Sequence, residues 1–251
     1  MKNRKLIITL LAALGGAPLA SAPAHAQYAT GREVQFTISV ENVSTPRTLA
    51  LSNGMTAPAP TAPILWTITD SGNPLFSAGK RDRGHGLEQL AEDGNPGVLA
   101  DYIKENLKSI TYSGVVTMPV RESKPGPIGP GKSFEFSVPA APGQVLSLAM
   151  MFGQSNDLFY APGAGGIALF DKKGNPLSAD VTAQLQLWDA GTEVNEEPGL
   201  GRDQAPRQSG PNTGPAEKGQ IRPVRDRFTY PKVRDVIRVT IRPTETSTSS
   251  R

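Results

Sequence analysis

The sequence predicts an all-β protein, an antiparallel β-sandwich with a small helical insertion. Two observations carry this prediction. Apolar residues alternate with polar ones along several short segments, which is typical of half-buried antiparallel strands. The 251 residues also include 26 glycines and 23 prolines, many of which lie between those segments, where turns are expected.

The strands are expected where the hydrophobic pattern has a period of two or is continuously apolar. Period-two segments occur at residues 34–40, 134–138 and 181–187, and each has a polar opposite face. Continuously apolar segments, expected to form more deeply buried strands, occur at residues 64–68, 145–152 and 167–170, and a closing strand is expected at 236–241. Residues 171–176, DKKGNP, predict a turn between two strands.

One region departs from this pattern. Residues 86–107 have helical spacing in two short pieces, separated by Gly-Asn-Pro-Gly at 94–97, and one helical face would carry Leu99, Tyr102, Ile103 and Leu107. Residues 195–224 have almost no large apolar side chains, so we expect a long loop or an extended strap. The simplest organisation is one domain over residues 27–243, followed by a disordered tail at 244–251.

The first residues predict export. A basic start is followed by a short apolar stretch and by Ala24-His25-Ala26, which is the pattern of a secretory signal peptide over residues 1–26. No later segment is apolar enough to span a bilayer. We therefore expect an exported protein, periplasmic or secreted, with no membrane span.

Charge and cysteine content exclude several classes of partner and site. The expected leader carries Lys2, Arg4 and Lys5, so its removal lowers 26 basic residues to 23, equal to the 23 acidic ones. The mature chain then has no excess of positive charge, which argues against nucleic acid as a partner. The chain has no cysteine, so neither a disulfide nor a thiolate zinc site can form.

Two motifs that suggest enzymes are better explained as loops. Residues 126–133, GPIGPGKS, match the phosphate-binding loop, but Pro127 and Pro130 lack the N–H groups that would hold phosphate, and a strand follows instead of a helix. Ser155 lacks the second glycine of a nucleophile elbow. His85 is the only histidine after the leader, and we expect it in an exposed loop.

The remaining candidate chemistry is that of carboxylate oxygens. Residues 187–198, LWDAGTEVNEEP, contain Asp189, Glu193, Glu196 and Glu197. Asp157 and Asp189 each follow an apolar run, so they can meet at one end of a sandwich, and Glu193 can turn back to them across Gly191. Calcium prefers such oxygen ligands. The pattern alone leaves a solvated loop, a metal site and the paired carboxylates of a glycosidase open.

Several motifs resemble one family. LWDAGTEVNEEPGLG, with SNDLF upstream and QAPRQSGPNTG downstream, resembles the spondin domain, the amino-terminal module of F-spondin, and in particular its bacterial exported members. NPLFSAG and GLEQLAEDGNP extend the resemblance to residues 34–241, nearly the whole mature chain. The resemblance implies a C2-like antiparallel β-sandwich that binds Ca²⁺ in loops at one end.

The resemblance also implies a set of calcium ligands. They are Asp157, Asp189 and Glu193, with Asn156, Asn195 and Glu196 as accessory candidates. Glu193 is a departure, because animal members have aspartate there, although glutamate also binds calcium. Leu158 replaces a common aromatic residue, which affects packing and not the ligands.

The implied function is that of a non-catalytic, calcium-binding adhesion or ligand-binding module of the cell envelope. Its partner would be an envelope glycan or an extracellular protein. The first alternative is a carboxylate-dependent hydrolase acting on envelope polysaccharide, which would need two carboxylates facing a cleft. The second is a structural protein whose folding is indifferent to calcium.

Overall fold

The computed structural model describes residues 32–244. The signal peptide expected at residues 1–26 lies outside the described residues, as does the expected tail except for Thr244. The described chain is a mainly β protein with antiparallel sheets and few short helices, which confirms the predicted class.

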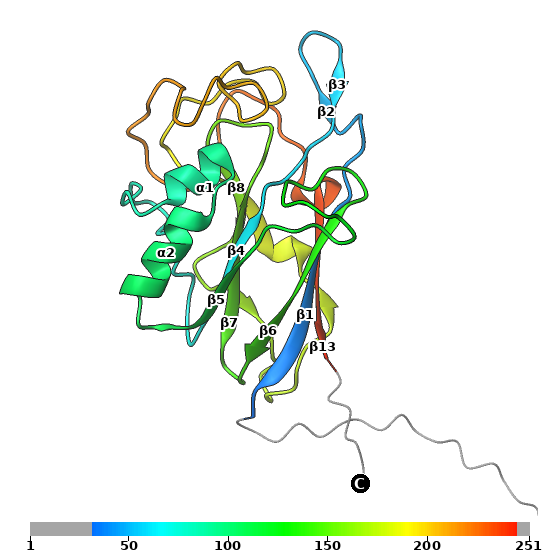
Figure 1. Ribbon diagram of the computed structural model, residues 1–251, viewed down its shortest axis with the longest axis vertical. Helices are drawn as coiled ribbons and strands as arrows, with labels where there is room; N and C mark the ends of the chain where they lie inside the picture. The colour runs from blue at the N-terminus through cyan, green and yellow to red at the C-terminus, as the bar shows by residue number, and fades with distance from the viewer. Residues whose placement is uncertain (1–31, 245–251) are drawn as a thin grey trace, which may run out of the picture.

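The strands form two large antiparallel sheets and one small hairpin (Figure 1). The four-stranded sheet has the order β10-β13-β1-β6, with bounds Ala179–Asp180, Ile237–Pro243, Val34–Asn42 and Ser133–Ala140. The seven-stranded sheet has the order β12-β11-β8-β7-β4-β5, with bounds Arg222–Pro223, Leu185–Asp189, Leu158–Pro162, Val145–Met151, Ile64–Thr69 and Ile110–Val116. In addition, β9 (Ile167–Ala168) pairs with β7, and β2 (Leu49–Ala50) pairs with β3 (Thr56–Ala57).

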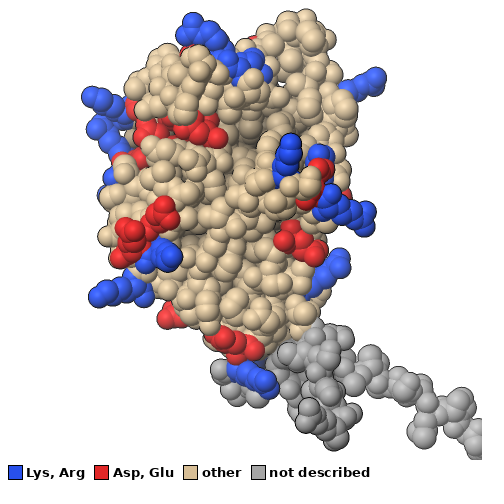
Figure 2. Space-filling view, in the orientation of Figure 1, with Lys and Arg blue, Asp and Glu red and all other residues tan. Residues whose placement is uncertain are grey.

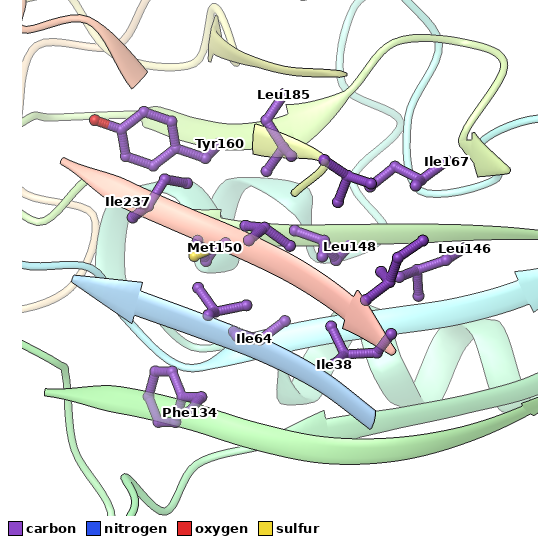
Figure 3. Close-up of a cluster of buried hydrophobic side chains, with 14 of the residues drawn as sticks. Ile38, Ile64, Phe134, Leu146, Leu148, Met150, Tyr160, Ile167, Leu185 and Ile237 are labelled. Atoms are coloured by element: carbon purple, nitrogen blue, oxygen red, sulfur yellow. The ribbon is translucent and has the colours of Figure 1, made fainter. Parts of the chain in front are cut away.

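The main hydrophobic core takes side chains from both sheets (Figure 3). Phe36, Ile38 and Val40 of β1 are fully buried, whereas the residues between them are only partly buried, so the period-two pattern has the predicted meaning. Ile64 and Leu148 enter the same core from the seven-stranded sheet. Burying a side chain of this size contributes about 1.5–3 kcal/mol, which makes this cluster the main source of stability in a chain without disulfides.

Two short helices cover the other face of the seven-stranded sheet (Figure 1). They are α1 (Leu87–Asp93) and α2 (Gly97–Asn106), divided at the Gly-Asn-Pro-Gly segment as the sequence predicts. A second buried cluster joins them to the sheet, and it includes Leu90, Leu99, Phe159 and Trp188. Neither these nor any other helix within residues 32–244 has the length and apolarity needed to cross a membrane.

The structure differs from the prediction at residues 181–187. Only Leu185–Asp189 is a strand there, and a 3₁₀ turn, η1 (Thr182–Gln184), precedes it. The backbone N–H of Thr182 donates to Asp180 Oδ1 at 2.9 Å, and the Thr182 hydroxyl accepts from the N–H of Val239 at 2.8 Å. These side-chain bonds favour a turn over the strand that the alternating pattern predicts.

Two loops also extend or correct the predictions. A second 3₁₀ turn, η2 (Val233–Asp235), precedes the closing strand. His85 is only half-buried in an open loop, but it is not free in solvent: its ring stacks on Tyr102 of α2, with ring centroids 3.9 Å apart. The long segment 195–224 is a folded loop whose Gln204 is fully buried, so it is not an extended strap.

Candidate metal site at one end of the longer sheet

The two predicted aspartates lie at the same end of the seven-stranded sheet. Asp157 immediately precedes β8, and Asp189 is the last residue of β11. Because β8 and β11 are antiparallel and Leu158 pairs with Asp189, the start of one strand lies beside the end of the other. Asp157 and Asp189 are both fully buried, and Glu193 is 2% exposed.

Asp157 organises the loop that follows β11. Its Oδ2 accepts the backbone N–H groups of Thr192 at 2.8 Å and Glu193 at 3.1 Å, and the Thr192 hydroxyl at 3.2 Å. Its Oδ1 is equally buried, yet it has no hydrogen-bond donor among residues 32–244. A buried carboxylate oxygen without a donor or cation is costly, so Asp157 Oδ1 needs a ligand that the described residues do not supply in this conformation.

Asp189 has the only arginine partner found for the three predicted ligands within the described chain. Arg222 of β12 donates from Nη2 to Asp189 Oδ2 at 2.9 Å. Asn195 donates to the same oxygen at 3.2 Å, and Gly191 N–H donates to Oδ1 at 2.8 Å. Asp189 Oδ2 is therefore fully used by two donors, whereas Asp189 Oδ1 accepts one hydrogen bond and retains a lone pair that can bind a cation.

Glu193 points toward the long loop 195–224. Its Oε1 accepts the N–H of Gly214 at 2.9 Å, and its Oε2 accepts from the Asn156 side chain at 3.3 Å. Gly214 suits this contact because a Cβ there would clash with the Glu193 carboxylate. Glu193 thus joins the β7–β8 turn to the far end of the loop.

The other two acidic residues of the LWDAGTEVNEEP segment have structural partners. Glu196 accepts the backbone N–H groups of Arg202 at 3.1 Å and Asp203 at 2.9 Å. Glu197 accepts both the N–H and the hydroxyl of Ser52, at 2.6 and 2.7 Å, which joins the loop to the β2–β3 hairpin. These two carboxylates order the loop, and of the accessory candidates only Asn156 and Asn195 contact the predicted ligands directly.

A buried glutamate on α1 belongs to the same group, and the sequence reasoning missed it. Glu92 is 1% exposed, and neither of its carboxylate oxygens has a hydrogen-bond partner within the described part of the chain. On a helical wheel Glu92 falls on the side away from Leu87, Leu90 and Ala91, so the sequence pattern carries no signal of its burial beside Asp157 and Glu193. We call Glu92, Asp157, Asp189 and Glu193 the acidic cluster.

Burial raises the pKa of every member of the acidic cluster. It raises the pKa of Asp157 to about 7, with a further contribution from the charge of Asp189. Burial raises the pKa of Glu92 to about 8, and the negative charges of Glu193 and Asp157 raise it further. The nearby Thr192 side chain acts in the opposite direction and lowers this pKa. The pKa values of Asp189 and Glu193 are also raised by burial, and Arg222 and the Gly214 N–H, respectively, oppose those shifts.

The acidic cluster is a set of oxygen donors, but it is not closed around one point. Across residues 32–244, no three acidic or histidine side chains are placed so that they could together hold a metal ion in this conformation. Glu193 turns to Gly214 and Asp189 turns to Arg222, which keeps their oxygens apart from Asp157 Oδ1. Figure 2 shows further acidic side chains gathered on the upper left of this face, where Figure 1 places α1 and the loops above it.

A shallow depression opens next to the acidic cluster. It has a volume of about 270 Å³, and its lining includes Arg81, Glu88, Thr192, Glu217 and Lys218. Charges of both signs surround it, and Thr192 both lines it and donates hydrogen bonds to Asp157. The P-loop-like residues 126–133 lie elsewhere and lead into β6, as the sequence predicts, with Ile128 bridging to Thr61.

Comparisons with known proteins add no assignment. No protein-family model matches the chain, and no curated protein sequence matches it.

Proposed function

We propose that this chain is an exported, non-catalytic calcium-binding module with a spondin-like, C2-type β-sandwich. The observation that carries the proposal is Asp157 Oδ1, a fully buried carboxylate oxygen with no donor among the described residues. Calcium accepts carboxylate, amide and backbone oxygens at irregular geometry, which are the donors that this end of the sheet offers.

The charge balance supports the same proposal. Four carboxylates are buried within the acidic cluster, and Arg222 of the described chain pairs with one of them, Asp189. Burying uncompensated charges is costly unless a cation or a proton neutralises them. A divalent cation held by Asp157, Asp189 and Glu193 would offset this repulsion, and its binding would require Asp189 and Glu193 to turn away from Arg222 and Gly214.

The ion would have a structural role. Asp157 belongs to the β7–β8 turn, and Glu193 bonds to Gly214 in the long loop. A cation between them would hold together the turn, the segment after β11 and the loop 195–224. The ordered loops would then form the surface that meets a partner, either an envelope glycan or an extracellular protein, in keeping with the spondin resemblance.

The hydrolase alternative has less support. A general acid needs a raised pKa, which Glu92 and Asp157 have. However, these two carboxylates are 1% and 0% exposed, so a polysaccharide cannot reach them without opening the loop. Carboxylates buried together under a loop suit an ion better than a polysaccharide, whereas a glycosidase needs two of them across an open cleft.

The test is a calorimetric titration of the protein and of its Asp189→Asn variant with calcium. We expect the protein to bind one ion, and we expect the variant to lose most of its affinity together with most of the calcium-dependent rise in its unfolding temperature. Asp171→Asn is the matched control, because Asp171 is an exposed turn residue that bonds to Lys173 and Asn175. Equal calcium binding by all three proteins would reject Asp189 as a ligand.

A further inference from the structure

Glu92 has an environment that its helix does not explain. It lies one residue before the end of α1, whose other buried residues are Leu87, Leu90 and Ala91. Both of its carboxylate oxygens are buried without a partner among residues 32–244. A solvated helix face would not bury a glutamate, and a packing role would be served better by an apolar residue.

The neighbours of Glu92 do not neutralise it. Asp157 and Glu193 lie close enough for their negative charges to raise its pKa. Thr192 is the nearby polar side chain, but its hydroxyl has one proton, which it donates to Asp157 Oδ2 at 3.2 Å. No described lysine or arginine forms an ion pair with Glu92.

Two unpartnered carboxylates therefore lie on elements that pack together, because Leu90 of α1 and Phe159 of β8 belong to the same buried cluster. One is Glu92 on α1, and the other is Asp157 with its Oδ1 at the start of β8. We propose that Glu92 is a further ligand of the bound cation, so that the ion fastens α1 to the strand ends. This inference rests on the proposed calcium site, and it adds a ligand from a separate element of the fold.

The consequence is a coupling between the ion, the helix and the long loop. Asp93, the next residue, accepts a hydrogen bond from the Gln208 side chain at 3.0 Å, so α1 is already joined to the loop 195–224. Gly94 ends the helix at φ +65°, and a Cβ there would lie 2.6 Å from the Ala62 side chain. The carboxyl end of α1 is thus tightly placed, and a cation on Glu92 would order the helix and the loop together.

The experiment compares Glu92→Gln and Glu92→Asp with the protein itself. Calcium affinity is measured by calorimetry, and hydrogen exchange of residues 87–93 is measured with chelator and with calcium. We expect Glu92→Gln to lower calcium affinity about tenfold or more and to abolish the calcium-dependent protection of α1. Glu92→Asp keeps the charge on a shorter side chain, so its calcium affinity should lie between those of the unaltered protein and Glu92→Gln. Glu105→Gln, an exposed change on α2, should leave both measurements unchanged.

The outcomes separate this inference from the proposed function. If Glu92→Gln binds calcium as tightly as the protein does and is more stable in chelator, Glu92 is a buried neutral acid and the inference is wrong, while the calcium site stands. If the unaltered protein binds no calcium, the proposed function fails and the inference fails with it. If Glu92→Gln does not fold, Glu92→Asp provides the test. The inference is then wrong if Glu92→Asp binds calcium as tightly as the unaltered protein and calcium does not protect α1 from hydrogen exchange.

Discussion

Thr192 donates both its backbone N–H and its hydroxyl to one oxygen of Asp157, at 2.8 and 3.2 Å. This one carboxylate oxygen therefore joins the turn before β8 to the segment after β11, in addition to the hydrogen bonds of Asn156. The other oxygen of the same group is left without a donor in the described chain. Asp157 Oδ2 therefore stabilises the fold, and Asp157 Oδ1 is the atom that indicates a bound cation.

Asp157→Asn should separate these two roles. The amide oxygen can still accept the N–H groups of Thr192 and Glu193, while the NH₂ group replaces the unpartnered oxygen and cannot bind a cation. We expect little loss of stability in chelator and almost no calcium-dependent rise in the unfolding temperature. Thermal unfolding followed by circular dichroism measures both. A full calcium-dependent rise in this variant would show that Asp157 does not bind the ion.

Gly191 should be required because the backbone of Gly219 packs closely against it, and not only because its φ is positive. Its φ is +70°, and a Cβ there would lie 2.8 Å from the carbonyl carbon of Gly219. Gly79 has a similar φ of +74° but nothing within 4 Å of an added Cβ. We expect Gly79→Ala to cost about 1–2 kcal/mol from the backbone alone. Gly191→Ala should cost at least about 1 kcal/mol more.

Urea unfolding of the two glycine variants provides the comparison. Gly191→Ala should also weaken calcium binding, because Gly191 lies between Asp189 and Glu193. Equal losses of stability in both variants would mean that the backbone at Gly219 moves away freely, and that the segment after β11 is not tightly packed.

Arg222→Gln should make the protein more dependent on calcium. Arg222 is the described cationic partner of buried Asp189, and its side chain is 41% exposed. Its removal leaves a buried charge partly uncompensated, so we expect a loss of about 1–3 kcal/mol in chelator. Calcium should recover part of that loss, since the ion replaces the missing positive charge.

The control for Arg222 is Arg238→Gln. Arg238 pairs with Glu41 at 3.3 Å on the surface, with side-chain exposures of 55% and 43%. Such pairs contribute at most about 1 kcal/mol, and we expect no change in calcium dependence. A similar stability loss in both variants, unaffected by calcium, would contradict the role given to Arg222.

Without calcium, stability should fall as the pH rises from 5 to 8.5. The pKa values of Glu92 and Asp157 are raised from 4.5 and 3.8 to about 8 and about 7 in the folded protein. At pH values between the unfolded-state and folded-state pKa values, the folded protein holds protons that the unfolded chain has released, so each rise in pH favours unfolding. The stability that these two protonated carboxyl groups contribute is fully present below about pH 4, and it is lost as the pH rises through the folded-state pKa values.

Calcium should reverse this trend, because it binds the deprotonated carboxylates. Unfolding temperatures measured across this pH range in chelator and in calcium would show two curves that diverge as the pH rises. A chelator curve that is flat, or that rises with pH, would mean that the acidic cluster is not protonated in the folded state.

The strands and helices with strong periodicity could be predicted from the sequence. Alternation in residues 34–40 predicts β1, and the Gly-Asn-Pro-Gly segment predicts the division between α1 and α2. Alternation failed at residues 181–184, because the hydrogen bonds of Asp180 and Thr182 outweigh a hydrophobic pattern in so short a segment. A hydrophobic pattern carries no information about hydrogen bonds between side chains and the backbone.

The candidate site could be predicted only in part. That Asp157 and Asp189 lie together follows from strand ends that the sequence marks, and Leu158 pairing with Asp189 brings this about. The roles of Arg222 and Glu92 could not be predicted, because each reaches the site from another element through the packing of α1 and β12. Nor could the sequence separate the loop-ordering Glu196 and Glu197 from Glu193, since all three are acidic residues in one polar segment.

The most direct test of the calcium site is the unfolding temperature of the protein in chelator, in millimolar calcium and in millimolar magnesium. A ligand that binds only the folded state adds about 2.7 kcal/mol at a hundredfold excess over its Kd, which corresponds to a rise of about 5–10 °C for a chain of this size. We predict such a rise with calcium and a much smaller one with magnesium, which requires a more regular geometry. Identical unfolding temperatures in all three solutions would contradict the calcium site.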